Sequence, residues 1–153
     1  MKNSIVLIVL ALCVGAVVTL GFLSSSPKTT KTMKVAGENI LVYVASDPIQ
    51  QTRGLSGTKI ETLGADGMVF LFKNKEERTF WMKDMNYDLD IVWIANDKVV
   101  KMERNIPAPH GEEPQRMKSM PYSVDTVLEL PAGGIDKFGI VPGAPVVLPG
   151  LLD

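Results

Sequence analysis

The chain has 153 residues, enough for one domain of ordinary size and too few for two domains joined by a long linker. Its hydrophobic content is 46% and its formal net charge is −1, but neither average holds along the chain. All 17 acidic residues follow Lys34, together with 12 of the 16 basic residues, so residues 35–153 carry a net charge of −5. A body this acidic argues against a nucleic-acid-binding protein, which needs clustered Lys and Arg to face phosphates.

The hydrophobic excess lies in one N-terminal segment, Ile5 to Leu23. Its 19 residues include no charge, and 16 of them are hydrophobic. Crossing a bilayer takes about 20 apolar helical residues, whereas the apolar core of a cleaved signal peptide usually has about 7–15. We therefore predict an uncleaved transmembrane helix in residues 1–23 that contacts membrane lipid through residues 5–23. Cleavage near Ser24 to Ser26 is the alternative and would make the protein secreted.

The charges beside this segment do not decide its orientation, because Lys2 lies on one side and Lys28, Lys31 and Lys34 lie on the other. An apolar run that begins at residue 5 resembles an export signal, so we expect the body outside the cytoplasm. Residues 24–34 are mainly Ser, Thr and Lys, a composition that predicts a solvated basic tether.

Short β-rich runs separated by turn residues follow from residue 35 onward. A strand is predicted over 38–45, where Ile40, Val42 and Val44 recur at period two. A helix is predicted over 48–53, because Asp47 can cap it, Pro48 suits its first position and Gly54 ends it. Further strands are predicted over residues 68–72, 79–82, 89–95, 99–104, 126–130 and 145–148, and a second helical turn over 134–138.

These elements predict a mainly β or α+β domain. Six or seven short strands with two short helices, and no alternation of strands with helices, favour an antiparallel or mixed sheet that rolls up. We expect a small open barrel or a two-layer β-rich fold, formed by one globular domain over residues 35–153. The long Pro-rich segment from Ile106 to Pro121 is predicted to be a loop.

Five short motifs occur in a characteristic order: Arg53-Gly54-Leu55, Gly67 to Phe70, Phe80-Trp81-Met82-Lys83, Leu89-Asp90-Ile91, and Leu128-Glu129-Leu130. In this the sequence resembles domain-of-unknown-function family 192, over about Val35 to Leu148. The resemblance implies a small exported or membrane-associated prokaryotic protein, and it implies no particular activity. Asp84-Met85 stands where the family usually has Asn-Thr, Asp88 where it commonly has Pro, and Ser56 where it usually has Met.

Charged residues and one tryptophan border the apolar runs: Arg53, Trp81, Lys83, Asp90 and Glu129. Burying any one charge without a partner is costly, so these residues either pair with one another or line a ligand site. In a ligand site the two cations would meet a carboxylate or phosphate, the two acids would accept hydrogen bonds from hydroxyls, and Trp81 would form an apolar wall.

Catalysis has weaker support in the sequence. Asp90 and Glu129 are the candidate acid and base of a hydrolase, on residue type alone. No metal site or cofactor is predicted: His110 is the single histidine, and a calcium loop over Asp84 to Asp90 lacks its glycine and its closing glutamate.

We therefore expect a membrane-anchored extracytoplasmic domain that binds a small polar or anionic ligand or an envelope component, without nucleic acid as a partner. A hydrolase acting through Asp90 and Glu129 is one alternative, and a purely structural accessory domain is another. The ligand, the cleavage of the N-terminal segment and the oligomeric state stay open.

Overall fold

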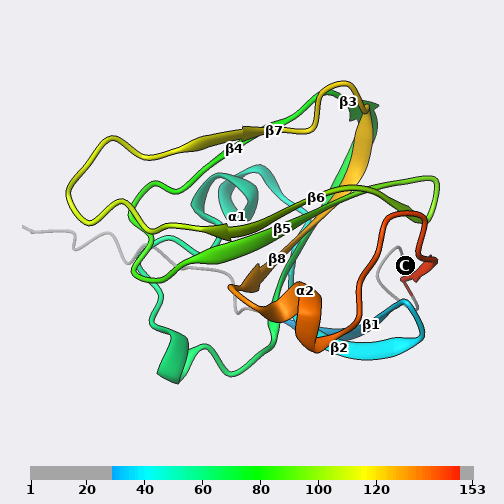
Figure 1. Ribbon diagram of the computed structural model, residues 1–153, viewed down its shortest axis with the longest axis horizontal. Coiled ribbons are helices and arrows are strands. Elements are labelled where there is room, and N and C mark those ends of the chain that lie inside the picture. Colours follow the sequence, from blue (N-terminus) through cyan, green and yellow to red (C-terminus); the bar gives the residue numbers. More distant parts are fainter. Residues whose placement is uncertain (1–28, 149–153) are drawn as a thin grey trace, which may run out of the picture.

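The computed structural model describes residues 29–148, which form nine strands and three short helices (Figure 1). The predicted membrane segment, residues 5–23, lies outside this range. No helix within residues 29–148 is long and apolar enough to cross a membrane. In chain order the elements are β1 (Thr30–Val35), β2 (Glu38–Ala45), α1 (Pro48–Arg53), η1 (Ile60–Thr62), β3 (Gly67–Glu76), β4 (Thr79–Trp81), β5 (Leu89–Ala95), β6 (Lys98–Ile106), β7 (Arg116–Lys118), β8 (Val124–Pro131), α2 (Gly134–Lys137) and β9 (Val146–Val147).

Seven strands form one mixed sheet in the order β6-β5-β8-β3-β2-β1-β9. All neighbours are antiparallel except β2 and β3, which are parallel because α1 and the following loop carry the chain back toward the end of the sheet at which β2 begins. The sheet curls into a half-barrel (Figure 1). Residues 143–146 hydrogen-bond to Asp97 and Val99 at the start of β6, so the segment next to β9 also reaches the other end of the sheet.

Both faces of the central strands are covered, and each face has its own hydrophobic core. Every residue of β5 is buried. Even-numbered residues such as Val92 and Ile94 belong to the inner core, which α2 covers with Ile135. Odd-numbered residues such as Ile91 and Trp93 belong to the outer core, which lies beneath α1, the 54–66 loop and the ribbon of β4 and β7. Alternate residues of a central strand point to opposite faces of the sheet and so belong to different cores.

The β-rich domain with two short helices predicted from the sequence is confirmed. Helix α1 has the predicted bounds, and the Asp47 carboxylate caps it by accepting from the backbone N–H groups of Ile49 and Gln50 at 2.9 Å. Helix α2 agrees with the predicted helical turn to within one residue.

Two strands of the structure, β1 and β7, are not predicted from the sequence. Residues 30–34 were expected to be tether but form most of β1, in which only Met33 and Val35 are buried and the outward positions are Lys and Thr. Strand β7 lies inside the predicted loop and pairs with β4. Both strands are short or polar on their exposed side, so their apolar periodicity is too weak to stand out.

Candidate functional site

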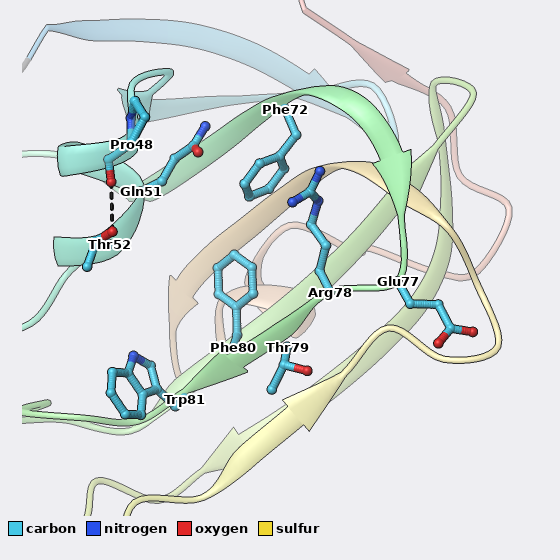
Figure 2. A pocket seen from close by; sticks show the side chains of 9 residues that line it. All are labelled: Pro48, Gln51, Thr52, Phe72, Glu77, Arg78, Thr79, Phe80 and Trp81. Atoms are coloured by element: carbon cyan, nitrogen blue, oxygen red, sulfur yellow. Dashed lines mark hydrogen bonds between the residues drawn. The ribbon is translucent and has the colours of Figure 1, made fainter.

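A pocket of about 410 Å³ opens between α1 and the segment that runs from β3 through the following turn into β4. Figure 2 shows its α1 wall facing the aromatic side chains of β4. The helix is held in place by Gln51, whose Nε2 donates to the Leu71 carbonyl of β3 at 2.7 Å. The lining residues are Pro48, Gln51, Thr52, Phe72, Glu77, Arg78, Thr79, Phe80 and Trp81.

The aromatic wall of this α1–β4 pocket is packed into the outer core. Phe80 meets Phe70 and Trp93 edge to face, with ring centroids 4.9 and 5.5 Å apart, and it meets Phe72 at 6.4 Å. Such perpendicular contacts are favourable and fix ring orientation. Phe72 and Phe80 therefore form a rigid apolar wall of the pocket, and exposed Trp81 lies at its edge.

The Arg78 guanidinium lies 3.4 Å from the centroid of the Phe72 ring, at one end of the pocket. It is already engaged, because Nη1 pairs with Glu76 at 2.9 Å and Nη2 donates to the Asn74 carbonyl at 2.7 Å. Arg78 therefore stabilises the turn between β3 and β4 and has little remaining capacity for a ligand.

Two other cations flank the opposite end, at Trp81. The indole is 41% exposed, Lys83 Nζ lies 5.1 Å from its ring centroid, and the Arg116 guanidinium lies 5.2 Å from it. Arg116 is placed there by the β4–β7 register, which sets it opposite Trp81. Neither cation forms an ion pair within residues 29–148. This part of an acidic protein therefore offers two cations and an aromatic surface to an anion.

Lys83 also belongs to a seam where residues 54–58 meet residues 83–87. Ser56 Oγ donates to the Lys83 carbonyl at 2.8 Å, and the Gly57 N–H donates to the Asp84 carbonyl at 2.8 Å. Asn86 Nδ2 donates to the Thr58 carbonyl at 2.9 Å. Exposed Arg53 precedes the seam at the end of α1. Arg53, Trp81 and Lys83, all predicted site residues, thus lie on the segments that border the pocket and the seam.

Asp90 is buried on the inner face, and its carboxylate is fully used by the backbone. Oδ1 accepts from the Asn105 N–H at 2.8 Å, and Oδ2 accepts from the Ile135 N–H at 2.9 Å. These bonds join β5 to the end of β6 and to α2. Asp90 therefore stabilises the fold on the inner face, away from the α1–β4 pocket.

Glu129 lies on the outer face with only 5% of its surface exposed, and its Oε2 has no hydrogen-bond partner within the described residues. An ideal Cβ on Gly54 would lie 3.7 Å from this oxygen, so Glu129 lies directly below the start of the seam. Burial raises the pKa of the Glu129 carboxyl to about 8. Near neutral pH the folded protein therefore holds a mostly uncharged acid in an apolar surrounding.

The two acids face opposite sides of the sheet. Glu129 pairs with Ile91 and Asp90 pairs with Leu130 in the β5–β8 register, so a whole sheet separates the carboxyl groups. A hydrolase with Asp90 and Glu129 as acid and base needs both carboxyl groups to line one cleft and to flank the scissile bond, about 5–9.5 Å apart. This arrangement does not provide that, and it does not bring the four predicted charges together as one set of ion pairs.

Metal-ligating residues do not gather within residues 29–148, where no three His, Cys, Asp or Glu side chains could share an ion. In the segment considered as a calcium loop, Asp88 Oδ1 accepts from the Ala108 N–H at 2.8 Å. That carboxylate therefore holds the loop after β6.

Sequence reasoning missed four residues of the pocket region: Phe72, Arg78, Phe80 and Arg116. The aromatic pair could have been suspected, because Phe72 and Phe80 flank a polar turn between two predicted strands. Arg116 could not, since its position depends on the pairing of β7 with β4 across more than 30 residues of chain.

The comparisons with known proteins agree with this fold. A family model, DUF192, described as Uncharacterized ACR, matches residues 30–148. The chain belongs to the DUF192 family. This confirms the resemblance carried by the five motifs, and the family description assigns no activity. No curated protein matches the sequence.

Two solved structures resemble this DUF192 protein. One is a proposed transcription regulator from Sinorhizobium meliloti 1021, with 28% identity, a TM-score of 0.66, and coverage of 78% of this chain and 93% of that chain. The other is a protein of unknown function from Novosphingobium aromaticivorans, with 26% identity, a TM-score of 0.64, and coverage of 82% and 89%. Both support the half-barrel as the fold of this chain.

Proposed function

We propose that this DUF192 protein is a membrane-anchored binding domain whose α1–β4 pocket takes a small anionic ligand. The observation that carries the proposal is the pair of cations without ion-pair partners in the described structure, Lys83 and Arg116, held against exposed Trp81 at the edge of a pocket of about 410 Å³. A carboxylate or phosphate can pair with the cations while an apolar part of the ligand lies on the aromatic wall.

The size and lining of the pocket limit the ligand further. Its volume lies at the small end of the range typical of small-molecule sites. Its walls combine aromatic faces with Gln51 and Thr52, whose protons are donated to backbone carbonyls and whose side-chain oxygens can accept a hydrogen bond from a ligand. A small organic acid or organic phosphate fits this combination better than a bare inorganic ion, because the bare ion leaves the aromatic wall uncovered.

The test is a binding screen of the full-length chain in detergent, using organic acids, organic phosphates, neutral sugars and duplex DNA. Anionic compounds are expected to raise the unfolding temperature, because a ligand that binds only the native state stabilises it. Removing either cation, by Lys83→Ala or Arg116→Ala, is expected to weaken anion binding about tenfold, and Lys98→Ala at the β5–β6 turn to leave it unchanged.

The same screen separates the other functional classes. Duplex DNA belongs in it because one structural relative is a proposed transcription regulator, and with a body of net charge −5 we expect no DNA binding. If no compound stabilises the protein and Lys83→Ala changes nothing, the pocket has no ligand role and an accessory structural domain becomes the better account.

We further propose that residues 5–23 anchor the protein and place the pocket outside the cytoplasm. An uncharged run of 19 residues is long enough to span a bilayer with little tilt. A reporter that is active only after export, fused after Asp153, is expected to be active in cells. Activity of a cytoplasm-dependent reporter at the same position, with the export reporter silent, would reverse the orientation.

A further inference from the structure

We propose that the ligand is a small anion that also carries a hydroxyl group, and that the Glu129 carboxyl binds this hydroxyl beneath the seam of residues 54–58 and 83–87. The inference rests on the proposed function, in which Lys83 and Arg116 hold the anionic end. It adds a second recognition point and names the class of ligand, for example a hydroxy acid or a phosphorylated polyol.

Glu129 is a buried acid whose hydrogen-bonding capacity is not satisfied within the described residues. It is 95% buried, and Oε2 has no partner among the residues described. Asp90, the other buried acid of the central strands, has both oxygens occupied by backbone N–H groups. Native proteins pair nearly all such buried groups, so an orphaned acceptor calls for an absent partner.

The nearest hydroxyl groups are unable to supply that partner. The Thr58 hydroxyl donates its one proton to the Leu55 carbonyl at 2.6 Å. Tyr87 must then be the donor in its 2.8 Å contact with Thr58, which uses the only proton of the phenol. Burial raises the pKa of Tyr87, the hydrogen bond with Thr58 lowers it, and the charge of Glu129 raises it further. The Tyr87 hydroxyl is thus committed to Thr58.

The seam above Glu129 has Leu55 and Met85 packed into the outer core on its inner side and hydrogen bonds to backbone carbonyls on its outer side. These are the bonds of Ser56, Gly57 and Asn86 described above, and several of these positions are exposed to water. Gly54 has no side chain to cover Oε2, and a Cβ there would lie 3.3 Å from the Phe70 ring. Because water can replace hydrogen bonds of this kind, the outer side of the seam can part more readily than the packed side chains of Leu55 and Met85 beneath it.

The position of the seam connects Glu129 with the anion end of the site. Lys83 contributes its carbonyl to the seam and its ammonium group to the Trp81 face. A ligand whose acid group lies at Lys83 can therefore direct a second group between the two segments of the seam toward Glu129.

The chemistry favours a hydroxyl as that second group. Desolvation is the cause of the raised pKa of Glu129, so no neighbouring cation stabilises the ionised form. A protonated carboxyl donates one hydrogen bond and accepts another, as a hydroxyl does. An ammonium group would instead require the buried acid to ionise, which burial opposes.

The experiment compares matched anions with and without the hydroxyl on the full-length chain in detergent by calorimetry. The pairs are 4-hydroxybutyrate with butyrate, and glycerol 3-phosphate with propyl phosphate, in which the hydroxyl is separated from the acid group by several bonds. The hydroxylated member is expected to bind about tenfold more tightly, the effect of one well-made hydrogen bond. The Glu129→Leu variant keeps the volume and is expected to lose this preference, whereas Glu129→Gln, which can donate and accept, is expected to retain it.

The outcomes separate this inference from the proposed function. Lys83→Ala should weaken both members of a pair equally, which leaves their ratio unchanged. Equal binding of the two members by the wild type, or an undiminished preference in a folded Glu129→Leu variant, would overturn the hydroxyl assignment while the anion site stands. Failure of all four anions to bind would refute both. Thermal unfolding checks that Glu129→Leu folds, as an apolar side chain in an apolar cluster should.

Discussion

Replacing Glu129 by glutamine is expected to remove a loss of stability that the wild type shows as the pH rises from about 4.5 to 8. The folded-state pKa of Glu129 is raised to about 8 by burial, from an ordinary value of 4.5. Between these values the folded chain keeps a proton that the unfolded chain has released. Unfolding then releases a proton, so higher pH favours unfolding, by about 1.4 kcal/mol per pH unit.

The size and range of this effect follow from the same pKa values. Below pH 4.5 both states hold the proton and the contribution of the neutral acid to stability is complete. Above about pH 8 both states are ionised and the loss, on the order of 5 kcal/mol, is also complete. Glu129→Gln cannot ionise, so its stability relative to the wild type should rise steadily across this window.

Urea denaturation of wild type and Glu129→Gln at pH 5, 6, 7 and 8 measures the difference directly. Other titrating groups contribute equally to both proteins, so the difference between the two curves isolates Glu129. Glu61→Gln, at an exposed position, is the matched control and should run parallel to the wild type. Parallel curves for Glu129→Gln and wild type would mean that the Glu129 carboxyl is not the buried neutral acid described here.

The sequence could show that Asp90 and Glu129 border apolar strands but could not show what each acid meets. In a sheet with one solvated face, polar residues alternate with apolar ones and reveal the buried side. Strands β5 and β8 are covered on both faces, and nearly all their residues are buried, so that alternation is absent. Only the β5–β8 register, which pairs Asp90 with Leu130 and Ile91 with Glu129, shows that the two acids point to opposite faces of the sheet.

Local features of the fold were predictable for a related reason. The Asp47 cap, Pro48 and Gly54 define α1 through interactions within eight residues, and the hairpin of β5 and β6 is set by Asn96-Asp97 between two apolar runs. The candidate site depends instead on contacts between distant segments. Arg116 meets Trp81, and Glu129 meets Gly54, only because the chain folds back on itself.

Phe80 and Trp81 show how one short motif serves both core and site. Alternate residues of a strand point to opposite sides, so Phe80 turns toward Trp93 in the outer core and Trp81 is left 41% exposed beside Lys83 and Arg116. The Phe-Trp-Met-Lys tetrapeptide that identified the family thus combines packing residues, Phe80 and Met82, with the two that an anion can reach.

Replacing Asp90 by alanine is expected to destabilise the protein by about 2–4 kcal/mol, because one buried and one partly buried backbone N–H group lose their acceptor. The affected groups are those of Asn105, which has a φ of 52°, and Ile135, at the start of α2. Without Asp90 the strained end of β6 and the helix that covers the inner core both lose their tie to β5. Asp90→Asn keeps one acceptor oxygen and should lose about half as much.

Urea denaturation tests this expectation against Asp136→Ala, which removes an acid that is 75% exposed and paired with Arg104 at 3.4 Å. An exposed pair of this kind contributes about 0–1 kcal/mol, so the control should remain close to the wild type. Anion binding by the folded fraction of Asp90→Asn should be unchanged, since Asp90 faces the inner core and the α1–β4 pocket lies on the other side of the sheet. A variant at Asp90 that is as stable as the wild type but no longer binds anions would instead make this carboxylate part of the ligand site.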